Sequence, residues 1–482
     1  MDSATSISLG SQDLKKLPIM ISLIIGAFFS ILNETLLNIA FPKLMVELNV
    51  STSAIQWLAT GYMLIVGVLV PASALIVQWF TTRQMFLGAI ILFTVGTLIC
   101  GIAPHFSVLL IGRMIQAAGA GLMMPVLMNT ILVLYPPEKR GTAMGSIGLV
   151  MMFAPAIGPT LSGLILESLH WRWLFFLVIP FAVLSIMISM KYLKNISQPT
   201  KPKVDILSLL LSIIGFGGIV YGFSGSGEGT DWSNPRVYGV VAVSVIALII
   251  FVFRQLRLKE PLLDLRAFKY PMFSMTAILL IVVMMTLFSS MSLLPFLFQS
   301  ALGLTVFASG LLMLPGSLLN GLISPLTGRL FDRFGPKLLI IPGSGMIVII
   351  MWFFTQVTVD TPKATFILLH IGLMIALSMI MMPTQTNGLN QLSQRYYPHG
   401  VAILNTLSQI AGAIGVAYFI GVMTSGQRRF LEKSSDPTSS ALIAEGLVRG
   451  ITNAFMIGFG MACFAFVLTL FMKRTSAPIK KL

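Results

Sequence analysis

The chain has 482 residues, of which 56% are hydrophobic and only 10% are charged. A soluble chain of this length needs more polar surface, so the composition excludes an ordinary soluble globular protein. The net charge of +15 does not indicate nucleic-acid binding, because the basic residues lie in short loops between apolar runs rather than on one face.

Uncharged apolar runs recur along the whole sequence, and each is long enough to cross the hydrocarbon core of a bilayer. Backbone polar groups must be satisfied within each run, so the runs are predicted to be helices. We predict fourteen membrane spans, at about residues 18–41, 54–77, 85–104, 107–134, 142–166, 172–193, 205–224, 237–256, 273–299, 307–327, 338–357, 364–387, 400–425 and 451–472. Cys100 and Cys463 each lie inside such a run, which favours small buried side chains over a disulfide or a metal site.

Loop charges predict how these spans are oriented. Most of the 31 Lys and Arg residues lie near the two termini and in the loops that follow even-numbered spans. Because positively charged loops stay in the cytoplasm, both termini are predicted to be cytoplasmic.

An internal repeat predicts the organisation of the chain. Met-Met-Pro-x-x-x-Asn occurs at 123–129, in the fourth span, and again at 381–387, in the twelfth. Each copy is followed by Tyr-Pro and then by Gly-x-Ala, at 141–143 and 400–402. An offset of eight spans predicts two six-span halves separated by an extra pair, and like-oriented halves around a central site are typical of transporters. The predicted divisions are a cytoplasmic N-terminus at 1–17, a six-helix bundle at 18–193, an inserted helix pair with cytoplasmic linkers at 194–272, a second six-helix bundle at 273–472 and a cytoplasmic C-terminus at 473–482.

Two ionisable residues lie within spans. Glu34 lies in the first span, where an acidic side chain costs about 3 kcal/mol to insert and normally faces an internal cavity. Desolvation favours the neutral carboxyl, as a reversible proton site requires; the alternative is a structural carboxyl that bonds to a neighbouring helix. Arg113, in the fourth span, keeps its charge and needs polar partners. Close to Glu34 it would favour the carboxylate and so complete a proton switch; alternatively, it ties helix ends together.

Small residues and prolines follow one another in the fifth span. Small side chains let another helix approach closely, and proline removes a backbone donor and bends a helix. We expect either a tight, kinked interface that prevents proton leakage or ordinary helix packing, formed by Gly148, Pro155, Gly158, Pro159 and Gly163.

A charged turn follows the tenth span and is predicted to lie at the cytoplasmic surface. A charge cluster in a tight turn can pair with neighbouring helix ends in one conformation and release them in another, so we predict a cytoplasmic gate at Gly328, Asp332, Arg333, Gly335 and Lys337. The corresponding turn of the first half has Gln78 in place of Asp332 and Thr81 in place of Gly335, which predicts a weaker gate there.

Other polar or adaptable side chains lie in or near spans. Some are expected to line a substrate cavity among Met and Phe neighbours, and others to bond between helices. The cavity candidates are Asn33, Asn38, Gln56, Met124, Asn387 and Gln409.

Along nearly its whole length the sequence resembles the major facilitator superfamily, in its fourteen-span drug:proton antiporter branch. The first-span motif of that branch is similar to residues 32–42, although Asn33 occupies the usual Asp position and the acid is displaced to Glu34. The fourth-span motif, associated in the family with proton transfer, is matched by Arg113, Gln116, Gly119 and Gly121. The fifth-span residues listed above resemble the antiporter motif, which separates exporters from proton-coupled importers, and residues 328–337 resemble the superfamily loop motif.

The resemblance implies an all-α integral membrane protein with the major facilitator fold, built from two six-helix bundles plus two extra central helices. It implies a secondary active transporter of a bacterial plasma membrane: a proton-coupled multidrug efflux antiporter that exports hydrophobic or amphiphilic drugs by alternating access. The sequence is similar to lincomycin-efflux-type proteins of Gram-positive bacteria, so lincosamide-type antibiotics are candidate substrates. The expected partners are drug-like molecules, protons and the bilayer; we expect a monomer driven by the proton motive force, with no cofactor, metal or nucleic acid.

Two alternatives to drug export stay open. The cargo of the same fold can be a lipid, a bile-like compound or an endogenous metabolite, with drug transport incidental. The second alternative is an intramembrane enzyme, which the four scattered histidines and the lack of an acidic pair within any span disfavour.

Overall fold

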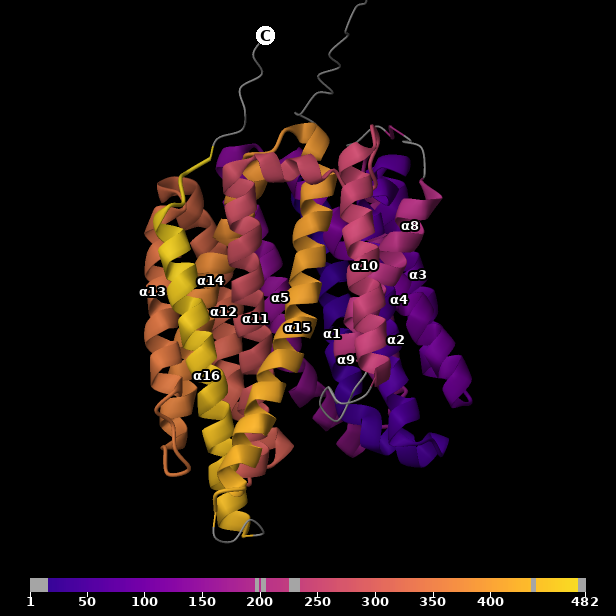
Figure 1. Cartoon of the computed structure of the whole chain (residues 1–482). Helices are drawn as coiled ribbons and strands as arrows, with labels where there is room; N and C mark the ends of the chain where they lie inside the picture. The colour runs from indigo at the N-terminus through magenta and orange to yellow at the C-terminus, as the bar shows by residue number, and fades with distance from the viewer. Residues whose placement is uncertain (1–15, 196–198, 201–204, 225–234, 435–438, 476–482) are drawn as a thin grey trace, which may run out of the picture.

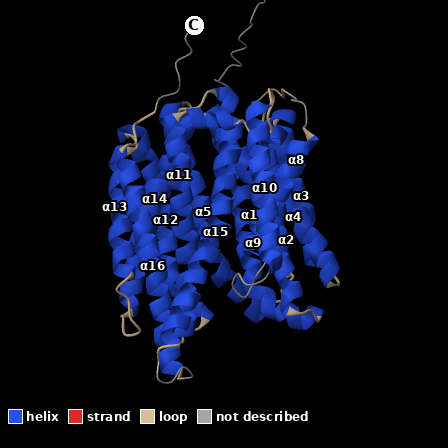
Figure 2. Cartoon of the chain, in the orientation of Figure 1, coloured by secondary structure: helices blue, strands red, loops and turns tan. Residues whose placement is uncertain are grey.

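The structure is a computed structural model that describes residues 16–195, 199–200, 205–224, 235–434 and 439–475, and omits the side chains of a few residues inside helices. Within these ranges every regular element is a helix (Figure 2). Fourteen of these segments are long and apolar enough to cross a membrane, which confirms the predicted number of spans.

Most helices follow the predicted spans, and several spans are divided into shorter elements. Trp173–Tyr192 comprises α6 and α7, Ile206–Phe223 includes a π-helical turn, Ile213–Gly217, between α8 and α9, and Pro271–Ala301 ends in a second π-helical turn, Leu297–Ala301. The elements are α1 (Lys16–Leu48), α2 (Thr52–Trp79), α3 (Thr82–Ile102), α4 (Phe106–Leu134), α5 (Arg140–Ser168), α6 (Trp173–Phe176), α7 (Ile179–Tyr192), α8 (Ile206–Ser212), α9 (Gly218–Ser224), α10 (Pro235–Arg257), α11 (Pro271–Phe296), α12 (Val306–Phe334), α13 (Lys337–Phe354), α14 (Lys363–Asn390), α15 (Tyr397–Leu431) and α16 (Ser440–Leu470).

Side-chain caps fix where several helices begin. Ser51 accepts a hydrogen bond from the backbone N–H of Ala54 at the start of α2, and Thr81 and Gln84 form a capping box at the start of α3. Such caps satisfy backbone donors that have no partner within the helix. The short polar connections therefore end one span and start the next.

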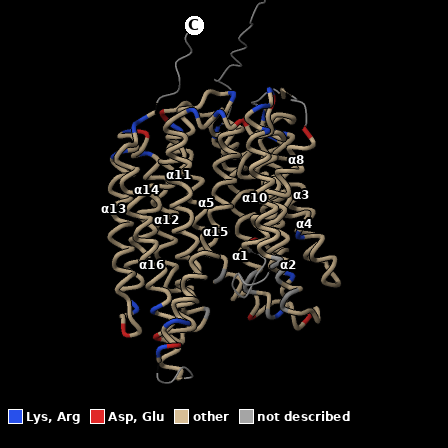
Figure 3. Tube along the Cα trace, viewed as in Figure 1, with Lys and Arg blue, Asp and Glu red and all other residues tan. Residues whose placement is uncertain are grey.

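The described ends of the chain lie at one end of the helix bundle. Lys16 lies over the ring of Tyr135 at the end of α4, and Thr475 bonds to Asn387 near the end of α14. We call this the terminal end and the other the opposite end. Lys and Arg gather mainly at the terminal end, and the middle of the bundle is nearly free of charge (Figure 3).

Helices α1–α7 pack against one another, and so do α11–α16. In Figure 1, α1–α4 lie on the right and α11–α14 and α16 on the left. The two sides meet where α5 packs along α12 and where α2 packs on α15. Of the inserted helices, α8, α9 and the π-helical turn between them pack against α2, and α10 packs on these segments. Helix α9 also contacts α15, so the pair lies over the second of these seams.

Several helices extend beyond the apolar spans predicted for them, among them α1, which ends at Leu48, and α12, which ends at Phe334. In the polar segment 426–450, α15 continues to Leu431 and α16 begins at Ser440, while residues 432–434 are not helical. Polar residues that project past the membrane do not interrupt backbone hydrogen bonding, so hydropathy placed the end of α15 too early and the start of α16 too late.

Candidate functional site

Arg113 lies at the centre of a buried polar network in the first half. Its Nη1 donates to Asn33 Oδ1 at 3.3 Å and to Gln116 Oε1 at 2.5 Å, and the guanidinium carbon lies 4.2 Å from the ring centroid of Tyr62. Gln116 in turn donates to Asn33 Oδ1 at 2.9 Å and to Thr97 at 2.7 Å. Hydrogen bonds thereby join the first-span motif, through Asn33, to the fourth-span motif. All side chains that bond to Arg113 here are neutral.

One donor of Arg113 remains available. Its Nε is buried and has no hydrogen-bond partner among the described residues. A buried, unpaired donor on a charged group is costly. The guanidinium can therefore donate a hydrogen bond to a further partner without losing its present ones.

Glu34 is half-buried in α1, next to this network. Consecutive residues on a helix point about 100° apart, so Asn33 and Glu34 approach Arg113 from different directions. In the described residues Asn33 makes the contact, while Arg113 acts on Glu34 only through its electrostatic field, without an ion pair. Glu34 and Arg113, which the sequence predicted as a pair, are therefore neighbours that do not form an ion pair.

Helix α5 packs tightly on the turn of α1 that carries Glu34. A Cβ at Gly158 would overlap the hydroxyl of Thr35, and Ser162 donates to the backbone carbonyl of Leu36 at 2.7 Å. Gly158 thus contacts the first span as a close-packing glycine does.

The other glycines predicted in this motif differ in their surroundings. A Cβ at Gly148 would overlap Ser324 of α12, whereas a Cβ at Gly163 would meet nothing within 4 Å. Pro155 lies half-buried within the continuous helix α5. The side chain of Pro159 lies outside the described set.

The predicted gate residue Asp332 contacts the start of α5. Its carboxylate accepts from the backbone N–H of Gly141 and of Thr142, each at 2.8 Å, and from the Thr142 hydroxyl at 2.6 Å. A carboxylate at a helix N-terminus satisfies free donors and interacts favourably with the helix dipole. Gly328 allows this approach, since a Cβ there would overlap the carbonyl of Gly141.

The remaining gate residues play other parts in the turn. Gly335 has φ of 83°, a left-handed conformation that favours glycine. Arg333 lies against the ring of Phe334, 5.1 Å from its centroid, and Lys337 is the first residue of α13. Of the predicted gate residues, the structure therefore brings Asp332 and Gly328, but not Arg333, to the start of α5 in the other half.

Arg140 is a buried contact between the halves that sequence reasoning missed. It is 4% exposed, bonds to the carbonyls of Leu132 and Tyr135 and donates to Asn390 Oδ1 of α14 at 3.0 Å. In the sequence it follows Lys139 and counts only as a loop charge. The carbonyls of Leu132 and Tyr135 belong to the same half, and only the packing of the two halves brings Asn390 to Arg140.

Contacts between α5 and α12 run from the terminal end to the middle of the two helices. Along α5, Gly141 and Gly148 meet α12, as described above, and Phe153 lies against Gly321. Near the opposite end, a Cβ at Gly163 of α5 or at Gly310 of α12 would meet nothing within 4 Å.

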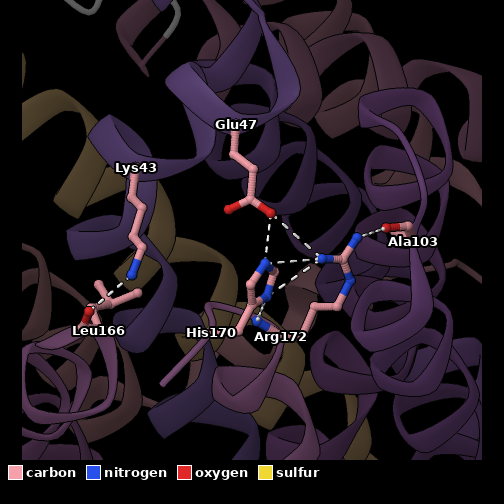
Figure 4. Close-up of polar contacts among 6 residues, drawn as sticks. All are labelled: Lys43, Glu47, Ala103, Leu166, His170 and Arg172. Carbon is pink, nitrogen blue, oxygen red and sulfur yellow. Dashed lines mark hydrogen bonds and ion pairs between the residues drawn. The ribbon is translucent and has the colours of Figure 1, made fainter. Parts of the chain in front are cut away.

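A charged cluster lies at the opposite end of the first half (Figure 4). Glu47 Oε1 lies 2.6 Å from His170 Nε2 and 3.6 Å from Arg172 Nη1, and Arg172 also donates to the carbonyl of Ala103. Partial burial raises the pKa of Glu47, but hydrogen bonds and charges from residues 170–172 lower it more, so the net pKa lies below its ordinary value. The cluster joins α1, the end of α3 and the connection between α5 and α6.

The other predicted motif and cavity residues are dispersed. Gly119 and Gly121 of α4 pack against α3 and α2, respectively. Asn33 is used in the Arg113 network, and Asn387 is fully buried and anchors residues 473–475. Met124 is half-buried and Gln409 is exposed on α15, while the side chains of Asn38 and Gln56 lie outside the described set.

Comparison with known proteins gives a consistent family. The family model described as Major Facilitator Superfamily matches residues 23–416. The chain is 52% identical to the lincomycin resistance protein LmrB of Bacillus subtilis (strain 168), covering 96% of this chain and 97% of that protein. It is 48% identical to the protein of the same name from Listeria innocua, covering 96% and 98%. The crystal structure of the human organic anion transporter MFSD10 is similar in fold, with a TM-score of 0.67 at 12% identity over 94% of this chain and 99% of that one.

Proposed function

Because this chain belongs to the major facilitator superfamily, we propose that it exports hydrophobic or amphiphilic drug-like molecules in exchange for protons. It is a multi-pass membrane transporter rather than an enzyme. The relatives that share about half of its residues are described as lincomycin resistance proteins, so lincosamide-type antibiotics are the first substrates to test.

The separated arrangement of Glu34 and Arg113 carries the proposal. Glu34 is an acid within a membrane helix, next to a permanent positive charge that still has one free donor, Nε. If Glu34 moves onto that donor, the carboxylate is favoured and the proton leaves; when the two are apart, the neutral acid is favoured. A change in their separation therefore binds or releases one proton.

Helix α5 links this switch to the gate. Through Gly158 and Ser162 it packs on the turn that carries Glu34, and through Gly141 and Thr142 it meets Asp332. Rocking of one half against the other would move both contacts together, as alternating access requires.

The sidedness of the cycle follows from the loop charges. With the positively charged terminal end in the cytoplasm of a bacterial cell, the described conformation is closed to the cytoplasm and open to the outside. A proton from outside would neutralise Glu34 and favour the return stroke. One charge moved across 100 mV supplies about 2.3 kcal/mol, and one pH unit about 1.4 kcal/mol. Both six-helix halves are present in one chain, so we propose a functional monomer.

Drug accumulation in bacterial cells that lack their own efflux pumps tests the proposal. Cells that make the protein are expected to accumulate less lincomycin, and less of a chemically unrelated amphiphilic drug, than cells that make Glu34→Gln. A proton uncoupler should abolish the difference. Reduced drug accumulation that persists without a proton gradient would contradict proton coupling. If the protein reduced the accumulation of no drug, lipids and metabolites would be tested next as substrates.

A further inference from the structure

The repeat predicts a second gate opposite the first. In the first gate, Asp332 at the end of α12 contacts Gly141 and Thr142 at the start of α5. By the repeat, the end of α2 should contact the start of α15, because Gly141 corresponds to Gly400. The carboxylate of this second gate is missing, since Gln78 occupies the position of Asp332.

A histidine lies where the second gate should be. His399, next to Gly400, is 6% exposed, and its Nε2 lies 3.3 Å from Nε2 of Gln78. The histidine belongs to the second half and the glutamine to the first. The contact therefore crosses between the halves at the terminal end.

The segment that follows the inserted helix pair also contacts His399. The segment that leaves α10 runs to Asp264, which is 2% exposed and donates its backbone N–H to His399 Nδ1 at 3.2 Å. Because Nδ1 accepts this bond, Nε2 of the neutral ring carries the hydrogen, so its approach to the amide nitrogen of Gln78 is a packing contact rather than a hydrogen bond. The bond from Asp264 fixes the orientation of the ring, and the ring then packs on Gln78.

The segment before the inserted helix pair contacts Gln78. Thr200 donates its backbone N–H to the carbonyl of Gln78 at 2.9 Å. Asp205 at the start of α8 forms a two-bond ion pair with Arg254 at the end of α10, at 2.7 and 2.8 Å. Thr200 thus bonds to Gln78, Asp264 bonds to His399, and the ion pair joins the start of α8 to the end of α10.

We propose that the inserted helix pair forms the missing part of the second gate: its linkers hold Gln78 and His399 together and keep α2 against α15 in the conformation closed at the terminal end. This inference rests on the alternating-access part of the proposed function. It does not depend on which molecule is exported or on proton coupling. Here His399 acts as a positioning residue for the closed state.

Distances between spin labels at Phe80 and Gln394, both exposed near this contact, test the inference in purified, membrane-reconstituted protein without drug or proton gradient. His399→Leu should raise the ratio of terminal-open to terminal-closed molecules roughly fivefold, equivalent to about 1 kcal/mol, the usual net contribution of one hydrogen bond. His399→Asn keeps an acceptor close to Nδ1 and should restore most of the closed population.

Two controls separate this role from general loss of packing. His370 is buried within the second half and contacts no residue of the first in any described bond, so His370→Leu should leave the distances unchanged. Asp264 has φ of −76°, which proline accepts, so Asp264→Pro removes the N–H donor. It should open the terminal end more than Asp264→Ala, which keeps that donor.

Equal distance distributions for His399→Leu and His370→Leu, or no recovery in His399→Asn, would overturn the inference. Gly145→Leu, which places a side chain between α5 and α12, is the positive control for terminal opening. If even that variant never opens the terminal end, alternating access itself fails; if it opens and His399→Leu does not, only the second gate fails.

Discussion

Asn33 gives Arg113 a neutral partner at the position where the similar first-span motif has an acid. Its Oδ1 accepts from both Arg113 and Gln116, and its Nδ2 donates to the carbonyl of Leu174. The positive charge therefore stays uncompensated within its hydrogen bonds and acts on Glu34 instead. In the described residues, the first-span acid of this chain is therefore not held to Arg113 by a hydrogen bond or an ion pair.

Asn33→Asp should convert Arg113 into half of a fixed ion pair. A buried charge that gains a partner is stabilised, by the same effect that makes loss of one partner cost about 3–5 kcal/mol. We expect a higher melting temperature in detergent and roughly tenfold slower drug transport, because Arg113 no longer attracts Glu34. A variant with unchanged stability and transport would contradict this role for Asn33.

Glu47→Gln should destabilise the opposite end in a pH-dependent way. The folded-state pKa of Glu47 lies below its ordinary value of 4.5. A depressed carboxyl pKa contributes stability above the unfolded-state pKa, and this contribution is lost as the pH falls through the folded-state pKa. The melting temperature of the variant should therefore lie below that of the wild type at pH 7, and the difference should shrink below about pH 4.5.

The matched control for this prediction is Glu432→Gln. Glu432 pairs with Arg428 at 3.6 Å, but both side chains are largely exposed. Exposed pairs contribute little stability. Its melting temperature should match that of the wild type throughout the same pH range.

At the scale of elements, apolar length predicted all fourteen spans, whereas their ends and interruptions were missed. The π-helical turn at Ile213–Gly217 and the extension of α16 back to Ser440 leave no mark in hydropathy. Both depend on neighbouring helices rather than on transfer to lipid.

Partners within the site were harder to predict than the residues themselves. Arg113, Gln116 and Asp332 all stood out in the sequence, but Thr97, Tyr62 and Arg140 did not. Threonine and tyrosine are common in membrane helices, and only the packing of α2, α3 and α4 brings Thr97 to Gln116 and Tyr62 to Arg113. Individual polar residues carry no sequence signal for such a contact.

Gly145→Leu and Gly163→Leu in α5 should have opposite effects on conformation. A Cβ at Gly145 would lie 2.5 Å from the carbonyl oxygen of Ser324, so a side chain there prevents closure at the terminal end. Gly163 has open space now, but rocking would bring its end of α5 towards α12. Leucine there should hold the protein in the described conformation.

Both variants should lose at least roughly tenfold in transport, while the spin-label distances at the terminal end lengthen only in Gly145→Leu. Gly88→Leu is the control, because Gly88 on α3 has equally open space and lies outside the contact between α5 and α12. Active Gly163→Leu protein would show that this part of α5 does not close against the other half.

At the scale of the whole molecule, the repeat and the loop charges predicted the main architecture. Two sets of helices, a shared terminal end and a basic surface there all follow from span length and charge. The conformation did not follow, since one sequence supports both states of an alternating-access cycle and only packing shows which state is described. The position of the inserted pair across α2 and α15 was equally out of reach, because no charge or spacing in residues 205–256 identifies its neighbours.

Proton flux triggered by drug addition, in liposomes that hold the purified protein, tests the central claim most directly. Wild type should move protons when lincomycin or another accepted drug is added, and Glu34→Gln should bind the drug but move none, because its amide cannot exchange a proton at this site. Drug-triggered flux of equal size in Glu34→Gln would contradict the assignment of the proton to Glu34.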